Sequence, residues 1–466
     1  MQIIKLIICI KASNLHVQFI NKKYYMAEKK PTRNPWLFIP TQYFAEGLPF
    51  ILVNQLSVAM FKSLGASNEF IGITSLLYIP WSIKFLWSPF VESKGTKRGW
   101  VLAMQALLSI LFILLAVSMQ LSHVIIMTVI LFIIISFLSA THDIATDGFY
   151  LFALDAKNQA FFTGIRSTFY RLAMIFTGGT LLMIAGASGS QLGSVSGGWT
   201  VSFSIAAIIF LALFFYHKRV LPYPKDDVPA SSVASSTKIP YRAVFIQYFT
   251  QKRIIVILTY ILLYRFGEGM LLKMVQPFMM DTIEKGGLGI SLSQVGFMYG
   301  TLGVLALVVG GILGGLAIKH YSLRRLIWLM AVAMNLPNLF YVYLAYFQPQ
   351  SILMIDYSFL SPMSTGMAFD FHPIVQACII IEQFGYGFGF TAFMVYLLYI
   401  SKGKYRTSFY AISTGIMAIG IMVPGFISGF VQSQVGYLGL FIASCVMTVP
   451  GMLTISFLPM EFGENK

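Results

Sequence analysis

Ten ionisable side chains lie inside long apolar segments of this sequence, and these residues are the ones that could do chemistry. A charge at the centre of a bilayer costs about 2.5–3.5 kcal/mol, so each is expected to face a water-filled cavity, an ion-pair partner or a ligand. Carboxylates and guanidinium groups in this setting can exchange protons or hold a charged ligand. They are Glu46, Lys84, Asp143, Asp147, Arg166, Arg171, Arg265, Glu268, Lys273 and Glu382.

The depth of each residue along its segment divides these charges into groups. A helix rises about 1.5 Å per residue, so the position of a residue in its apolar run gives its depth. The residues near the midplane are Glu46, Arg171, Arg265, Glu268 and Glu382. The residues nearer the expected cytoplasmic end are Lys84, Asp143, Asp147 and Arg166, and Lys273 lies further outward.

Two carboxylates, Glu46 and Glu382, have no basic residue one turn away on their own helix. A group that couples transport to protons must be ionised in one state and protonated in the other, which requires its solvation or its partner to change. We predict that Glu382 is the coupling residue, because the glycines from Gly385 to Gly389 let its helix bend. Glu46 is the second candidate.

Two arginines on different halves of the chain are candidates for cargo binding. Arg171 and Arg265 could clamp a carboxylate through paired hydrogen bonds. Arg265 is three residues from Glu268 and could equally be neutralised by it. Polar residues on the same two helix faces complete the predicted binding set, namely Glu268, Gln276 and Gln42.

Lys84, Asp143, Asp147 and Arg166 form the third predicted group. Two carboxylates one turn apart, near two basic residues, predict a salt-bridge cluster that serves structure or gating. Contact with cargo or protons is the alternative. We therefore assign these four residues to gating.

Enzyme and metal chemistry find little support in the sequence. The run from His142 to Gly148 resembles the Asp-x-x-Asp-Gly opening of lipid alcohol phosphotransferases, but it has one residue too many and no second motif follows. The three cysteines are isolated, and no Gly-x-x-x-x-Gly-Lys-Ser/Thr loop occurs. We expect no catalytic residue, metal or cofactor.

The elements that carry these residues are predicted to be membrane-spanning helices. Hydrophobic residues make up 57% of the 466 residues and charged ones only 11%. Apolar runs of about 18–25 residues are long enough to cross a bilayer as helices, and they do not alternate as barrel strands would. Twelve such runs begin near Trp36, Phe70, Trp100, Val124, Ala160, Trp199, Ile254, Val295, Leu326, Pro373, Phe409 and Tyr437.

The net charge of +15 is distributed asymmetrically along the chain. With the amino terminus inside, the predicted cytoplasmic segments contain 25 Lys and Arg residues and the external loops two. This positive-inside pattern predicts that both termini are cytoplasmic and that the charge meets lipid headgroups, with no nucleic acid as partner.

The two halves of the chain repeat a pattern. Glu46-Gly47 in the first apolar run is matched by Glu268-Gly269 in the seventh, 222 positions later. Such duplication with carboxylates at mid-membrane is typical of secondary transporters. We predict a cytoplasmic arm (1–35), a six-helix half (36–218), a cytoplasmic linker (219–252), a second six-helix half (253–460) and a cytoplasmic tail (461–466).

Several motifs resemble the AmpG-like muropeptide permeases of the major facilitator superfamily. They are Glu46-Gly47-Leu48-Pro49, the run from Lys84 to Pro89, the run from Ser139 to Asp147, Tyr170-Arg171-Leu172-Ala173, and the run from Glu382 to Phe393. The resemblance implies proton-driven import of anhydromuropeptides, which carry N-acetylglucosamine linked to anhydro-N-acetylmuramic acid. It also implies a bacterial inner membrane. His142 departs from the pattern, since Gln is usual there.

The prediction is thus an all-α, twelve-helix permease that carries a muropeptide or related amino-sugar oligosaccharide with protons across the bilayer, as a monomer. A permease of the same fold for a neutral disaccharide or an acyl-CoA is the alternative. A polytopic membrane enzyme is the distant alternative.

Overall fold

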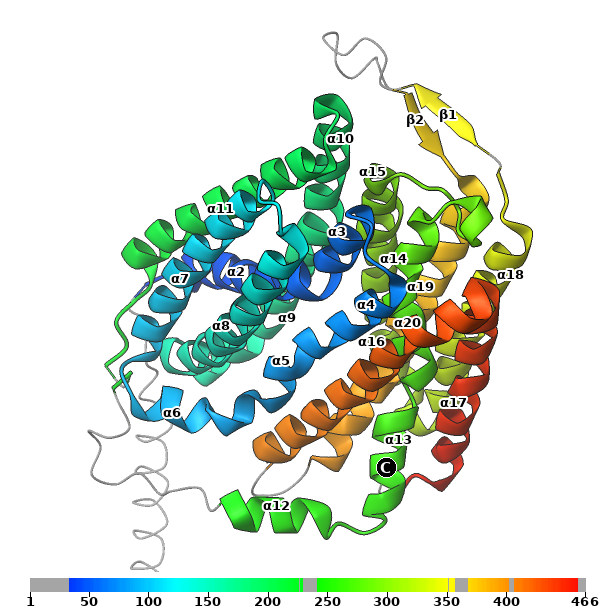
Figure 1. Cartoon of the computed structure of the whole chain (residues 1–466). Helices are drawn as coiled ribbons and strands as arrows, with labels where there is room; N and C mark the ends of the chain where they lie inside the picture. Colours follow the sequence, from blue (N-terminus) through cyan, green and yellow to red (C-terminus); the bar gives the residue numbers. More distant parts are fainter. Residues whose placement is uncertain are drawn as a thin grey trace, which may run out of the picture.

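The computed structural model describes residues 33–225, 227–228, 241–350, 352–356, 368–401 and 406–459. Most of the predicted amino-terminal arm, part of the predicted linker and the predicted tail at 461–466 lie outside these residues. Figure 1 shows the helices of residues 35–220 on one side of the molecule and those of residues 254–457 on the other.

The first half is built from helices whose starts are fixed by polar caps. Thr96, Asp155 and Ser194 each accept a hydrogen bond from the backbone three residues on, which satisfies an N–H that the helix leaves free. The elements are α2 (Ile39–Ile51), η2 (Leu52–Leu56), α3 (Ser57–Ser63), α4 (Asn68–Ile73), η3 (Thr74–Tyr78), α5 (Ile79–Ile83), η4 (Lys84–Leu86), α6 (Ser88–Ser93), α7 (Lys97–Ser118), α8 (Val124–Ala153), α9 (Ala156–Met174), η5 (Ile175–Leu181), α10 (Leu182–Leu192) and α11 (Val195–Val220).

The second half follows a short helix, α12, that packs on α20 through Tyr248 and Phe409. Its elements are α12 (Tyr241–Phe249), α13 (Ile254–Leu263), α14 (Phe266–Met280), α15 (Leu292–Val295), η8 (Gly296–Gly303), α16 (Val304–Tyr321), α17 (Leu323–Asn335), α18 (Leu339–Phe347), β1 (Leu353–Asp356), β2 (Ala368–Phe371), α19 (Pro373–Ile400) and α20 (Arg406–Leu453).

Twelve membrane crossings are accounted for in the described residues. Ten helices are long and apolar enough to cross a membrane. The last of these, Ser408–Phe457, contains two crossings because the backbone of Gly436 is not helical (φ 69°, ψ −179°). The twelfth crossing is the run from α4 to α6, which is broken into short pieces where Pro80 and Pro89 begin new turns. The predicted helical membrane fold is confirmed.

One short hairpin departs from the all-α prediction. Strands β1 and β2 pair antiparallel between α18 and α19, with Leu353 opposite Phe371 and Asp356 opposite Ala368. The hairpin lies at the same end of the molecule as α15 (Figure 1). Alternating apolar residues in a loop of this length can pair outside the membrane without any helix.

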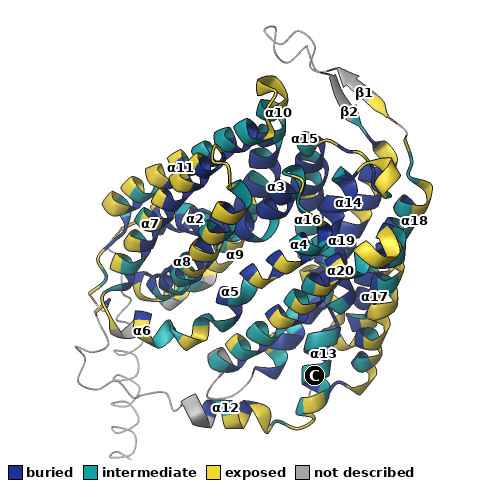
Figure 2. Ribbon diagram, in the orientation of Figure 1, coloured by how far each residue is buried: buried dark blue, intermediate teal, exposed yellow. Residues whose placement is uncertain are grey.

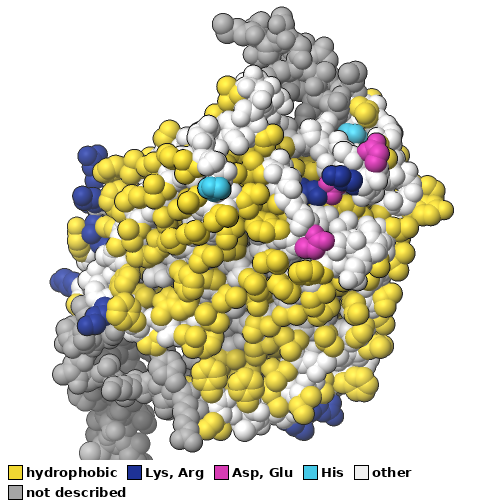
Figure 3. Space-filling model, viewed as in Figure 1, with side chains coloured by type: hydrophobic (Ala, Val, Ile, Leu, Met, Phe, Trp, Pro, Cys, Tyr) yellow, Lys and Arg dark blue, Asp and Glu magenta, His cyan; other side chains and the backbone are white. Residues whose placement is uncertain are grey.

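The outer surface is apolar, as a lipid-facing surface must be. Large exposed side chains such as Ile126, Ile208 and Ile255 lie on helices, whereas the residues between helices are buried (Figure 2). Figure 3 shows a face covered by hydrophobic side chains, with Lys and Arg mostly toward its margins.

The two halves meet closely at one end, which we call the sealed end. There η5 and η8, both π-helical, cross with so little space that a Cβ on Gly300 would lie 1.9 Å from the carbonyl oxygen of Gly178. Likewise α4 crosses α20, where a Cβ on Gly429 would meet the carbonyl of Asn68 at 2.0 Å. Glycine is required at such contacts because two backbones touch.

A polar network also bridges the halves at the sealed end. The Lys62 ammonium lies 2.6 Å from the Asp281 carboxylate, and both side chains are about nine-tenths buried. The Tyr437 hydroxyl donates to Asp281 (2.6 Å), and the Asn68 amide donates to Gln432 (2.7 Å). Separation of the halves here would break all three contacts.

The glycine crossing yields a test. Gly300→Ala should drive the halves apart at the sealed end, because the added methyl group cannot fit beside Gly178. In a variant without native cysteines, spin labels at Leu192 and Glu284, both exposed, should show a larger population of long distances. Gly315→Ala, at a position with open space, is the matched control and should leave the distances unchanged. Equal distance distributions in the two variants would contradict this account of the seal.

Candidate functional site

Three adjoining hollows of about 340, 380 and 340 Å³ form a cavity between the halves. Each is of the size that holds a small ligand. Glu46 and Tyr170 border the first and second hollows, Tyr78 borders the first and third, and Tyr386 and Phe390 border the second and third. The residues come from both halves, so one ligand can touch both.

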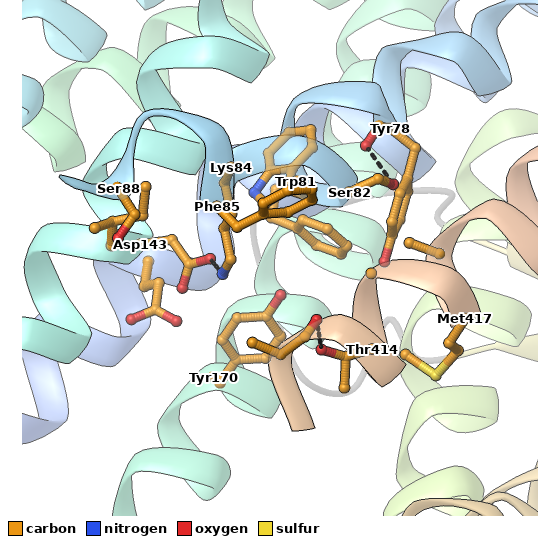
Figure 4. A pocket seen from close by; sticks show the side chains of 16 residues that line it. Tyr78, Trp81, Ser82, Lys84, Phe85, Ser88, Asp143, Tyr170, Thr414 and Met417 are labelled. Carbon is orange, nitrogen blue, oxygen red and sulfur yellow. Dashed lines mark hydrogen bonds and ion pairs between the residues drawn. The ribbon is translucent and has the colours of Figure 1, made fainter. Parts of the chain in front are cut away.

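The first hollow contains an ion pair and a group of aromatic rings (Figure 4). Lys84, from the short turn after α5, donates to the Asp143 carboxylate of α8. Tyr78, Trp81 and Phe85 surround this pair in the close-up view. Pro80 and the break at Lys84 turn this segment so that the ammonium points toward α8.

Asp147 and Arg166 form a second pair one turn further along α8. Arg166 lies 3.3 Å from the Asp147 carboxylate and donates to the Tyr43 hydroxyl at 3.1 Å. The side chains of Lys84, Asp147 and Arg166 are 36%, 46% and 35% exposed. The cavity is therefore open to solvent at this end, which we call the open end. The four residues predicted as a salt-bridge cluster thus form two ion pairs.

Glu46 lies beside these pairs and borders both the first and the second hollow. Its carboxyl group is within hydrogen-bonding reach of Asp143. Its buried Oε2 atom has no hydrogen-bond partner within the described part of the chain. Two carboxyl groups in contact can share a proton, so this position combines proton exchange with access to the cavity.

Arg265 and Glu268 form a buried pair on α14. Arg265 donates to both carboxylate oxygens, at 2.9 and 3.3 Å, and its Nη2 also donates to the Tyr386 hydroxyl at 2.6 Å. Arg265 borders the third hollow, whereas Glu268 lies behind it and borders none of the three hollows. The structure therefore shows the neutralised pair that the sequence left as an alternative.

The other predicted binding residues lie in different surroundings. Arg171 borders the second hollow, facing Gly311 of α16, and Gln276 borders the third. Gln42 is completely buried and borders none of the three hollows, and its amide has no partner among the described residues.

Glu382 does not meet the condition under which the sequence favoured it. Its carboxylate accepts from Tyr341 (3.1 Å) and Gln383 (2.9 Å), and it is 1% exposed. It borders none of the three hollows, because its side of α19 faces α18, whereas Tyr386 and Phe390 face the cavity. The face of a helix within a bundle depends on packing, which the glycines after Glu382 do not specify.

Sequence reasoning gave no role to several residues that border the cavity. Lys273 borders the third hollow together with Asn54 and Gln55 of the first half. Lys273 was recognisable as a charge in an apolar run. The aromatic residues, among them Tyr78 and Trp81, gave no signal because aromatic side chains are common throughout the chain.

Within the described part of the chain, no group of three His, Cys, Asp or Glu side chains could hold a metal ion. The cavity chemistry of those residues is thus that of ion pairs, carboxyl groups, amides and aromatic rings.

Comparison with known proteins defines the class of this one. The Major Facilitator Superfamily profile matches residues 42–380, so the chain belongs to that superfamily. A crystal structure of a D-xylose-proton symporter has the same fold, with a TM-score of 0.66, 11% identity and coverage of 90% of this chain and 95% of the other. The protein is a multi-pass secondary transporter and not an enzyme.

The relatives by sequence agree with the resemblance drawn from the motifs. The anhydromuropeptide permease of Escherichia coli (strain K12) is 25% identical over 88% of this chain and 77% of its own length. A transporter of Rickettsia conorii named AmpG 4 is 21% identical over 88% of this chain and 93% of its own. The chain is therefore similar to AmpG-like permeases across both halves.

The ion pair at the open end gives a stability prediction. Lys84→Met should lower the free energy of unfolding by leaving Asp143 without its partner, and Lys84→Met with Asp143→Asn should recover part of the loss. A coupling energy of about 1 kcal/mol is expected, because Lys84 is partly solvated by the cavity. Thermal unfolding of the purified wild type, both single variants and the double variant measures it, and strictly additive effects would contradict the pairing.

Proposed function

We propose that this protein imports anhydromuropeptides, or related amino-sugar oligosaccharides, together with protons. The observation that carries the proposal is the cavity between the halves, where aromatic rings lie beside carboxyl, guanidinium and amide groups. Such a lining matches a cargo with sugar rings and several hydrogen-bonding groups. The name of the similar Escherichia coli permease supports the choice of cargo.

Each end of the cavity suits a different part of this function. Arg171 contributes an unpaired guanidinium in the second hollow, and the Arg265–Glu268 pair presents a donor beside Tyr386 in the third. Sugar rings can pack on Tyr78, Trp81 and Phe390, which border these spaces. The ion pairs Lys84–Asp143 and Arg166–Asp147 stand at the open end, where they gate entry and release.

Glu46 is our first candidate for proton coupling, with Glu382 in reserve. Glu46 touches Asp143, whose charge is balanced by Lys84, and it faces the cavity. A bound cargo or a closed cavity would exclude water from this carboxyl group and so favour its protonated form. Opening toward the cytoplasm would rehydrate it and release the proton.

Transport in proteoliposomes tests the proposal. Under an inward-directed proton gradient, labelled N-acetylglucosaminyl-anhydro-N-acetylmuramic acid should accumulate above its external concentration, and a neutral disaccharide should not. Collapse of the gradient with a protonophore should stop accumulation. Accumulation of the neutral disaccharide alone would favour the alternative cargo instead.

The same assay examines the coupling residue. Glu46→Gln should abolish accumulation under the proton gradient while retaining exchange of labelled for unlabelled cargo, since a permanently neutral side chain still permits binding. Glu382→Gln, a matched change outside the cavity, should retain both activities. The opposite pattern would assign coupling to Glu382.

We further propose that the protein acts as a monomer in a bacterial inner membrane, with both termini and the open end facing the cytoplasm. The 25-to-2 distribution of basic residues supports this orientation. A reporter active only in the cytoplasm should work after Lys466 or at Ser235, and one active only in the periplasm should work at Gly193. Periplasmic activity at Ser235 would overturn the orientation.

A further inference from the structure

We infer that Lys273 and Gln276 form a subsite for the carboxylate of the cargo at the sealed end of the cavity. The inference rests on the proposed function, in that it takes the cargo to be an anionic amino-sugar oligosaccharide. It adds a residue pair that recognises the acid and an orientation in which the cargo is held.

Both residues lie on α14 and border the third hollow. They are three positions apart, so their side chains point to the same side of the helix. Lys273 is eight positions beyond Arg265, which places it about 12 Å further toward the sealed end. Asn54 and Gln55 of the first half border the same hollow, so polar groups of both halves surround one space.

The Lys273 ammonium is not neutralised by the described protein. Lys62, Lys84, Arg166 and Arg265 each form an ion pair. For Lys273, no carboxylate among the described residues lies in ion-pair contact, and no neighbouring charge acts on it. A buried ammonium without a counter-ion is unfavourable in a membrane protein unless a ligand supplies the negative charge.

Gln276 points to a ligand independently of Lys273. It is 3% exposed, and neither its Oε1 nor its Nε2 atom has a hydrogen-bond partner among the described residues. Buried amide groups are nearly always hydrogen-bonded, so an amide that borders a cavity without a partner indicates a missing ligand group. One turn from an ammonium, its N–H donors can bind the same carboxylate.

The position of the subsite orients the cargo. A carboxylate held by Lys273 and Gln276 places the sugar rings toward Tyr386 and Phe390, which border the same hollow nearer the open end. When the sealed end opens, Lys273 is the cavity cation closest to the entering cargo, so its field attracts an anion from that side. A neutral disaccharide gains nothing from this arrangement.

Binding to the purified protein tests the subsite. The probes are N-acetylglucosaminyl-anhydro-N-acetylmuramic acid with its free lactyl carboxylate and the carboxamide of the same compound. Lys273→Gln should weaken binding of the acid about tenfold, since a charge-assisted contact is lost, and change binding of the carboxamide less than about twofold. Lys273→Arg should retain the preference for the acid.

Lys319→Gln, which removes an exposed charge at the far end of α16, is the control and should bind both probes as the wild type does. Without probe, Lys273→Gln should be at least as heat-stable as the wild type, because it removes an unpaired buried charge. A marked loss of heat stability would show that Lys273 has a structural partner, and it would overturn the subsite. Equal weakening of both probes, or weakening of neither, would overturn it while leaving the proposed function intact. If the wild type bound neither probe, the proposed cargo would fall and the subsite with it.

Discussion

Charge pairing within each half is the constraint on which the rest of the structure depends. The membrane makes an unpaired charge costly, so a transporter that opens and closes must not lose its ion pairs when its halves separate. Lys84–Asp143 and Arg166–Asp147 lie within the first half, and Arg265–Glu268 lies within the second. Of the ion pairs between described residues, Lys62–Asp281 joins the halves, and it lies at the sealed end. The halves can therefore separate at the open end without breaking an ion pair, whereas the sealed end is held by one.

Much of the fold could be predicted from the sequence because the membrane imposes a simple requirement. Each crossing needs a long apolar run, and predicted starts such as Val124, Ile254 and Pro373 coincide with the observed ones. The broken second crossing was recognisable as an apolar run, but its division into short turns depends on prolines and on the contact of Lys84 with α8. The hairpin between α18 and α19 was not expected, because loops outside the membrane lack that requirement.

The candidate site was only partly predictable, for a different physical reason. Depth along a helix follows from counting residues, so the charges near the cavity were recognised as a set. The direction in which a side chain points depends on how helices pack, so Glu382 was expected at the cavity although it bonds to Tyr341 within the second half. Pairing across helices could be proposed for Asp143, because basic residues lay at the same depth. The unpaired state of Lys273 could not, since it depends on which side chains are absent around it.

Distances at both ends of the molecule, measured by pulsed electron paramagnetic resonance with and without cargo, test the central claim most directly. Spin labels at Leu192 and Glu284 report on the sealed end, and labels at Lys94 and Tyr321 on the open end, all four being exposed positions. The account predicts a second population in which the first distance is longer and the second shorter, while the distance from Lys94 to Leu192 within the first half stays constant. A change in that internal distance, or movement at one end alone, would contradict two halves that move as units around paired charges.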